Sequence, residues 1–235
     1  MMKTITQFML SMLLLCGAAG PVHSSGVAGL PELFKNSIPV NLKDGLKLVE
    51  VKKRCEDCAP WRLVDFRDNK SPQPFKQEKV SVQAGYTAMY AFPGTEYFAN
   101  TKIEQSAPGS YDKDRAVVID AIRTEYARKK ELVAGYLRDN PKVRERVDSL
   151  QPKDKEAIEF EAGSYKGVEY VSYTENVIGL TGATISQLHF FVPKRELIIT
   201  AYLLKQKKSK FTTIAEFLPL RRDFIEAYID FLSAE

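Results

Sequence analysis

The feature that constrains the fold most is a pair of consecutive strand-like segments near the C-terminal end of the chain. Residues 184–192 (TISQLHFFV) and 197–204 (LIITAYLL) have the composition of β-strands, and Pro193 opens the short turn between them. The second segment is apolar on both alternating faces, which consist of Leu197, Ile199, Ala201 and Leu203 and of Ile198, Tyr202 and Leu204. Such a strand is typical of the centre of a sheet that is covered on both sides.

Two helical segments are predicted to provide this cover. Over residues 112–138 the apolar side chains follow helical spacing, and Asn140-Pro141 ends the pattern; they are Val118, Ile122, Tyr126, Val133 and Leu137. Over residues 219–233 a second helix is expected, with Pro219 in its first turn and an apolar stripe of Leu220, Phe224, Tyr228 and Phe231. We expect the two helices to lie on opposite faces of the sheet.

The remaining strand-like segments lie on both sides of the long helix. Before it are 46–53, 61–66, 86–92 and 97–105, and after it are a short helix over 142–150 and strands over 157–161 and 168–173. We expect a hairpin at 46–66, preceded by an irregular lead-in over 25–45. This order predicts a single α+β domain over 25–235, with a largely antiparallel sheet covered by a long central helix and a C-terminal helix.

The first 24 residues have the pattern of a secretory signal peptide. Lys3 is followed by an apolar stretch over 5–19, and Val22-His23-Ser24 provides compact residues before a cut after Ser24. The stretch is shorter than the roughly 20 residues that span a bilayer, although a retained anchor and a buried N-terminal helix remain alternatives. Cys16 raises the alternative of a lipoprotein, but Leu15 is not the small residue that lipidation requires. We therefore expect a periplasmic or secreted protein without a transmembrane segment in its mature chain.

Two cysteines remain after such a cleavage. Cys55 and Cys58 flank Glu56 and Asp57, and in an oxidising compartment the default is a structural disulfide between them. A thiol-redox role is the alternative, but it requires a lowered thiol pKa, and neighbouring acids raise it. Zinc is a third reading, although two cysteines and one histidine do not complete a four-ligand site.

Charge and motifs exclude several classes of function. The net charge of +4 is too small to indicate nucleic-acid binding. The glycine motifs of nucleotide sites and the common hydrolase motifs are absent, and we expect neither a metal nor a cofactor. His189 is the one histidine after residue 23, and alternation places it beside Gln187, opposite Leu188 and Phe190. We expect a packed or partly exposed strand histidine, not a catalytic one.

One cluster has the composition of a recognition surface. Tyr170, Tyr173, Glu175 and Asn176 precede the glycine-containing loop 179–184, and aromatic side chains with polar tips are common at binding surfaces. The edge of a hydrophobic core is the alternative interpretation of the same residues. The acids Glu159, Glu161 and Glu169 are read as solvated strand residues, but the sequence leaves open a carboxylate pair.

The second half of the chain also resembles a known fold. The resemblance rests on Tyr170 and Tyr173, on Gly179-Leu-Thr-Gly182, on the two-strand hairpin and on a helix that contains Arg222-Asp223-Phe224. This order of elements, over roughly residues 80–235, resembles the PsbP/DcrB-type α+β fold. Members of that family are mostly accessory, binding or assembly proteins, and the resemblance implies no catalytic residues.

These observations predict an exported, soluble, non-catalytic binding or accessory protein of the cell envelope with a protein partner, such as an assembly factor. Two alternatives remain. A carboxylate-based hydrolase requires a cleft with at least one strongly perturbed acid. A thiol-redox protein requires an exposed and reactive Cys55 or Cys58.

Overall fold

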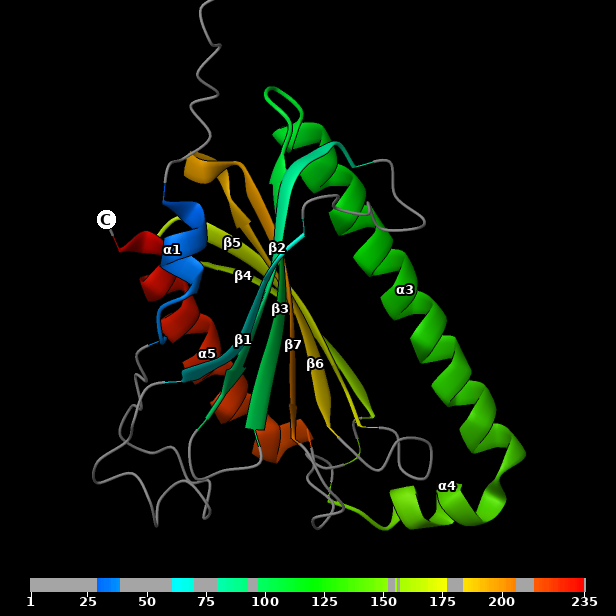
Figure 1. Cartoon of the computed structure of the whole chain (residues 1–235). Coiled ribbons are helices and arrows are strands. Elements are labelled where there is room, and N and C mark those ends of the chain that lie inside the picture. Colours follow the sequence, from blue (N-terminus) through cyan, green and yellow to red (C-terminus); the bar gives the residue numbers. More distant parts are fainter. Residues whose placement is uncertain are drawn as a thin grey trace, which may run out of the picture.

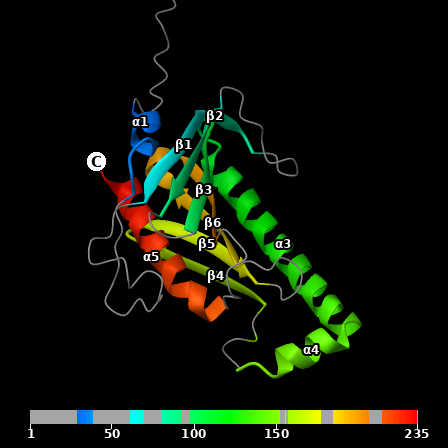
Figure 2. The ribbon, with the colours of Figure 1, turned by 60° about the horizontal axis from the view of Figure 1, so that its bottom comes forward.

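A computed structural model describes residues 29–38, 61–69, 80–92, 97–151, 155, 157–176, 184–205 and 214–234. These residues form a seven-stranded antiparallel sheet with helices on both faces (Figures 1 and 2). The predicted α+β class, with a long helix and a C-terminal helix packed against an antiparallel sheet, is confirmed.

The elements follow the predicted order closely. The first half of the described chain contains α1 (Leu30–Phe34), β1 (Arg62–Asp68), β2 (Val82–Ala91), β3 (Tyr97–Ser106), α3 (Tyr111–Asp139) and α4 (Pro141–Asp148). The second half contains β4 (Ile158–Tyr165), β5 (Val168–Glu175), β6 (Ile185–Val192), a 3-10 turn (Pro193–Arg195), β7 (Leu197–Lys205) and α5 (Ile214–Ser233).

The sheet consists of two antiparallel meanders that meet at its centre. Its strand order is β1-β2-β3-β7-β6-β5-β4, and every neighbouring pair is antiparallel. Strands β1 to β3 form one meander and β4 to β7 form the other, so the β3–β7 ladder joins the two. The predicted central position of the doubly apolar strand is confirmed, since β7 has three strands on each side.

The two long helices lie on opposite faces, as predicted. On one face α5 packs with α1 on a large core, in which Phe224 and Tyr228 stack with ring centroids 5.4 Å apart. Trp61 extends this core, with its ring 5.0 Å from Phe92 and 5.0 Å from Phe224. On the other face, the first half of α3 packs on a smaller core around Val118, Ile122, Val171, Phe191 and Ile198.

Several predicted boundaries were wrong for local reasons. Helix α5 begins at Ile214, so Pro219 lies inside it, where its missing N–H removes one helical hydrogen bond on the exposed side. Strand β4 continues to Tyr165, beyond the predicted end at 161, because pairing with β5 overrides the weak strand propensity of Ala162 and Gly163. Within the lead-in, residues 30–34 form a helix that buries Leu30 and Phe34.

Some expectations concern residues outside the described ones. They are the signal peptide with its cut after Ser24, the strand 46–53 that would complete a hairpin with 61–66, and the Cys55–Cys58 disulfide. Strand β1 pairs with β2, with a register shift between Leu63 and Asp65, and Trp61 forms an isolated bridge with Ile38. In the part of the chain that the structure describes, no helix is long and apolar enough to cross a membrane.

Candidate functional site

The four residues of the expected recognition surface belong to or follow β5, and the alternation of that strand divides them. Tyr170 and Asn176 lie on the α5 side of the sheet, whereas Tyr173 and Glu175 lie on the α3 side. Each has a partner within the protein, and they do not form one continuous patch. Asn176 donates a hydrogen bond of 2.7 Å to Thr184 Oγ1, and the other three belong to two separate networks. Their role in recognition stays a prediction.

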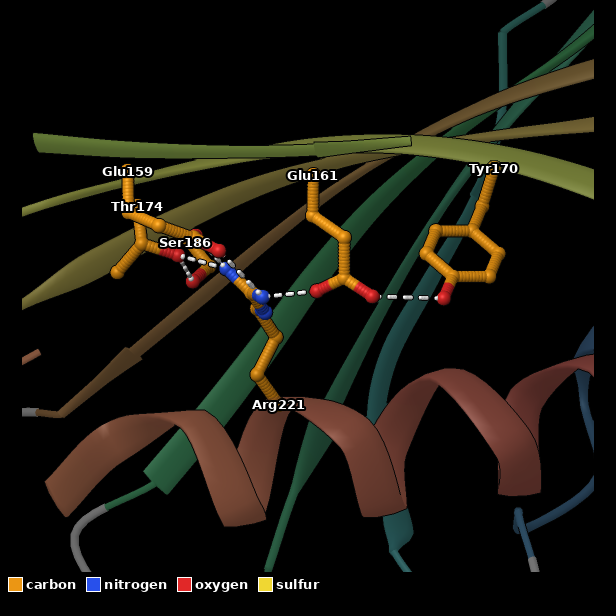
Figure 3. A network of polar contacts seen from close by, with 6 residues as sticks. All are labelled: Glu159, Glu161, Tyr170, Thr174, Ser186 and Arg221. Carbon is orange, nitrogen blue, oxygen red and sulfur yellow. Dashed lines mark hydrogen bonds and ion pairs between the residues drawn. The ribbon is translucent and has the colours of Figure 1, made fainter. Parts of the chain in front are cut away.

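The network on the α5 side is centred on Arg221 (Figure 3). Its guanidinium forms ion pairs with Glu159 and Glu161 of the edge strand β4 and donates a hydrogen bond of 2.7 Å to Thr174 Oγ1. The Tyr170 hydroxyl donates to the other oxygen of Glu161 at 2.8 Å. Burial and this carboxylate raise the pKa of Tyr170 to about 12, so the phenol stays protonated and keeps donating.

The burial of the Arg221 side chain indicates that this network has a structural role. The Arg221 side chain is 3% exposed, against 21% for Glu159 and 35% for Glu161. A buried guanidinium without counter-charges is strongly unfavourable, and the two carboxylates compensate it. The network therefore fixes the edge strand β4 to helix α5. The expectation that Glu159 and Glu161 are solvated strand residues was wrong, because strand alternation alone does not reveal an arginine from a helix 60 residues later.

The network on the α3 side has a defined direction. Tyr173 donates to Gln187 Oε1 at 2.6 Å, which leaves the Gln187 amide nitrogen to donate to His189 Nε2 at 2.8 Å. The imidazole then carries its hydrogen on Nδ1 and donates to Thr200 Oγ1 at 3.2 Å. The predicted placement of His189 beside Gln187 and opposite Leu188 and Phe190 is confirmed.

The electrostatics of His189 follow from its burial. Desolvation lowers its pKa to about 3, so the ring is neutral at physiological pH and serves as a hydrogen-bond relay between two strands. Because the side chain is buried, a substrate bound at the surface would not contact it. The expected packed strand histidine is confirmed.

Charged residues connect α3 to β5 near both ends of their contact. Arg115, in the first turns of α3, forms an ion pair with Glu169. About four turns further along, Lys129 Nζ lies 2.6 Å from Glu175 Oε2, and the same ammonium lies 6.0 Å from the centre of the Tyr173 ring. Beyond this point the helix diverges from the sheet, and α4 lies away from the strands (Figures 1 and 2).

The divergence of α3 leaves part of the sheet uncovered. On β7, Ala201 and Leu203 are fully buried on the α5 side, whereas Tyr202 on the α3 side is 37% exposed. Tyr202 pairs with Asn100 of β3 and with Gln187 of β6, and Lys102 lies two residues from Asn100 on the same face. We call Asn100, Lys102, Gln187 and Tyr202 the open face. The expectation that both faces of β7 are covered was wrong at Tyr202.

One acid beside the open face has a perturbed pKa. Burial raises the pKa of Glu104, and the ammonium of Lys102, 2.6 Å away, opposes this effect. The Glu104 side chain is only 3% exposed, so its carboxylate is enclosed by the protein and does not line a cleft. Among the described residues, no group of three or more potential ligands lies close enough to hold a metal ion.

Comparisons with known proteins provide no assignment. No family model matches the chain, and neither a curated protein nor a solved structure matches it. The resemblance to the PsbP/DcrB-type fold therefore stays a prediction from the order of elements.

Proposed function

We propose that the protein is an exported, non-catalytic accessory protein of the cell envelope that binds a protein partner on its open face. The observation that carries this proposal is the exposure of Tyr202 on the central strand of the sheet. A central strand is the position that a globular fold buries most completely, and the other face of β7 follows that rule. The exposure of Tyr202 departs from this rule, and a binding role would explain it.

The composition of the open face suits a protein ligand. Tyr202 offers an aromatic ring with a polar tip, a residue type enriched at the energetic centres of protein interfaces. Asn100 offers an exposed amide group that can pair with a polypeptide backbone, and Lys102 adds one cation whose charge Glu104 balances. A partner segment with an aromatic or aliphatic anchor and free backbone amides matches this chemistry.

The use of the ionisable groups supports a non-catalytic role. Arg221 forms ion pairs with both Glu159 and Glu161 between β4 and α5, and His189 is buried and neutral. Each of these groups has a structural task that accounts for its position. The carboxylate-hydrolase and thiol-redox alternatives remain untested, the second because Cys55 and Cys58 lie outside the described residues.

Site-specific photo-crosslinking tests the proposal. A photoreactive amino acid is placed at position 202, in place of Tyr202, in a chain that its native host expresses and exports. It is expected to yield one abundant adduct, which mass spectrometry identifies. The matched control carries the same amino acid at Leu132, which is also exposed but lies on α3 away from the open face.

Quantitative binding to the captured partner completes the test. Tyr202→Ala and Asn100→Ala are each expected to weaken binding by about tenfold or more, while Leu132→Ala changes it less than about twofold. All three variants should keep the melting temperature within a few degrees. Equal adducts from both positions, or undiminished binding by Tyr202→Ala, would reject the open face as the binding surface.

A further inference from the structure

The two edges of the sheet differ in how readily each could pair with a further strand. The β1 edge is blocked, since its pairing with β2 is interrupted by a bulge between Leu63 and Asp65 that leaves Val64 exposed. Charged side chains occupy much of the remaining strand, including Arg62, Arg67 and Asp68. Bulges and charges are the usual devices that prevent edge-to-edge association.

The β4 edge has no bulge, and its two charged side chains, Glu159 and Glu161, are both ion-paired with Arg221. All eight residues from Ile158 to Tyr165 pair with β5 in one unbroken register, and the strand contains no proline, lysine or arginine. In the part of the chain that the structure describes, no backbone hydrogen bond other than those to β5 involves a β4 residue. The outward-facing amides and carbonyls of β4 are thus arranged to accept another strand.

The acids of β4 do not block the edge as isolated charges would. Glu159 and Glu161 point to the α5 side, and Arg221 draws both carboxylates toward the helix. Their charge is thereby partly neutralised, and the same ion pairs hold β4 straight against α5. The edge that a further strand would meet is therefore regular, and Arg221 offsets part of its negative charge.

We infer that β4 pairs with β4 of a second copy of this chain, antiparallel and across a twofold axis, so that two sheets join into one. The twofold axis is perpendicular to the sheet, so opposite residues must share a face and the residue on the axis pairs with itself. An axis at Glu161 would oppose two carboxylates, and an axis at Phe160 would place Glu159 against Glu161. An axis at Ala162 avoids both.

The register centred on Ala162 is the self-complementary one. It places Glu161 opposite Gly163, Phe160 opposite Ser164 and Glu159 opposite Tyr165 of the second copy, so no like charges face each other directly. The small exposed side chain of Ala162 fits the crowded position on the axis. Moving the axis to Gly163 also separates the carboxylates but shortens the paired segment, so charge and length together favour Ala162.

Disulfide trapping tests both the dimer and its register. Directly opposite Cα atoms in an antiparallel pair lie about 4.5–5.5 Å apart, so Ala162→Cys is expected to form a disulfide-linked dimer readily. Ser164→Cys is the matched control, since it is exposed on the same face but lies about 13 Å from its symmetry mate. Both changes are made with Cys55 and Cys58 replaced by serine, and mass spectrometry locates the bond.

Sedimentation of the otherwise unaltered protein provides an independent measurement. A dimer is expected at about 10 µM, and Ala162→Lys, which places two ammonium groups on the axis, should weaken association by about tenfold or more. Ala162→Ser should leave it unchanged. A monomeric unaltered protein, or equally fast trapping of Ser164→Cys, would overturn the inference. If the unaltered protein is monomeric and Ala162→Lys no longer binds the captured partner, the β4 edge would instead be assigned to pairing with a strand of that partner.

This inference is independent of the open face. Crosslinking at Tyr202 reports on the α3 side of the sheet, whereas trapping at Ala162 reports on its edge. Either proposal can therefore fail while the other stands.

Discussion

The two helical layers of this protein cover the two faces of the sheet to different extents. On the α5 side, aromatic and aliphatic residues from α1, α5 and all seven strands form one continuous core, and the interior positions of β7 are fully buried. On the α3 side the core is small, a polar row crosses three strands, and α3 runs away from the sheet toward α4. The comparison indicates that the α5 layer carries most of the stability of the fold.

The largest effect is expected from a truncation within the α5 layer. Phe224 is fully buried between Trp61 and Tyr228, and Phe224→Ala should cost about 3–5 kcal/mol of unfolding free energy. Ile122→Ala in α3 should cost less, about 2–3 kcal/mol, because it faces the smaller core. Urea denaturation measures both. A larger cost for Ile122→Ala would reverse the proposed division between the layers.

The next largest effect is expected from removal of the buried guanidinium. Arg221→Met leaves two carboxylates without their counter-charge, and the loss should be about 3 kcal/mol. Adding Glu159→Gln and Glu161→Gln to this variant should restore much of the loss, since no unpaired charge then remains. Denaturant unfolding of the single and triple variants separates this charge effect from a packing effect, which the glutamine changes would not rescue.

Acidification is expected to destabilise the protein through His189. Its pKa is about 3 when folded and near 6.5 when unfolded, so the unfolded state binds the additional proton. Stability from this residue is complete above pH 6.5 and falls by about 1.4 kcal/mol per pH unit between pH 6.5 and 3. Thermal melts of His189→Leu should lose this part of the pH dependence. Identical slopes for both proteins would contradict the role of burial.

The smallest effect is expected at the last contact between α3 and the sheet. Lys129→Ala removes a partly exposed ion pair with Glu175 and should cost less than about 1 kcal/mol. Hydrogen exchange in the second half of α3 should nevertheless increase, because this pair is the contact beyond which the helix diverges. Unchanged exchange there would show that α3 is held by other contacts.

Much of the fold could be predicted from local patterns. The doubly apolar pattern of 197–204 identified the central strand and the need for cover on both faces, and helical spacing identified the two long helices that provide it. The β4–β5 turn was missed although Lys166-Gly167, with φ of 47° and 79°, is a typical two-residue hairpin turn. The start of α5 was missed because Pro219 was read as a helix start, whereas an exposed position tolerates it inside the helix.

The site was less predictable, because its geometry depends on residues far apart in the sequence. Tyr170, Tyr173, Glu175 and Asn176 were identified by composition, but strand alternation assigns them to opposite faces. Arg221 pairs with Glu159 and Glu161 about 60 residues earlier, and no local pattern links them. Tyr202 was assigned to a covered face, since its apolar neighbours gave no sign that α3 would diverge.

The pairing of β3 with β7 constrains the order in which the sheet can form. These strands are about 100 residues apart in the sequence, and the ladder between them is the one that joins the two meanders of the described sheet. Until β7 is available, β3 is an open edge and Ala99 and Ile103 lack their neighbours. The sheet therefore cannot be completed before β7 (Leu197–Lys205) has been synthesised, and until then its two meanders remain unjoined.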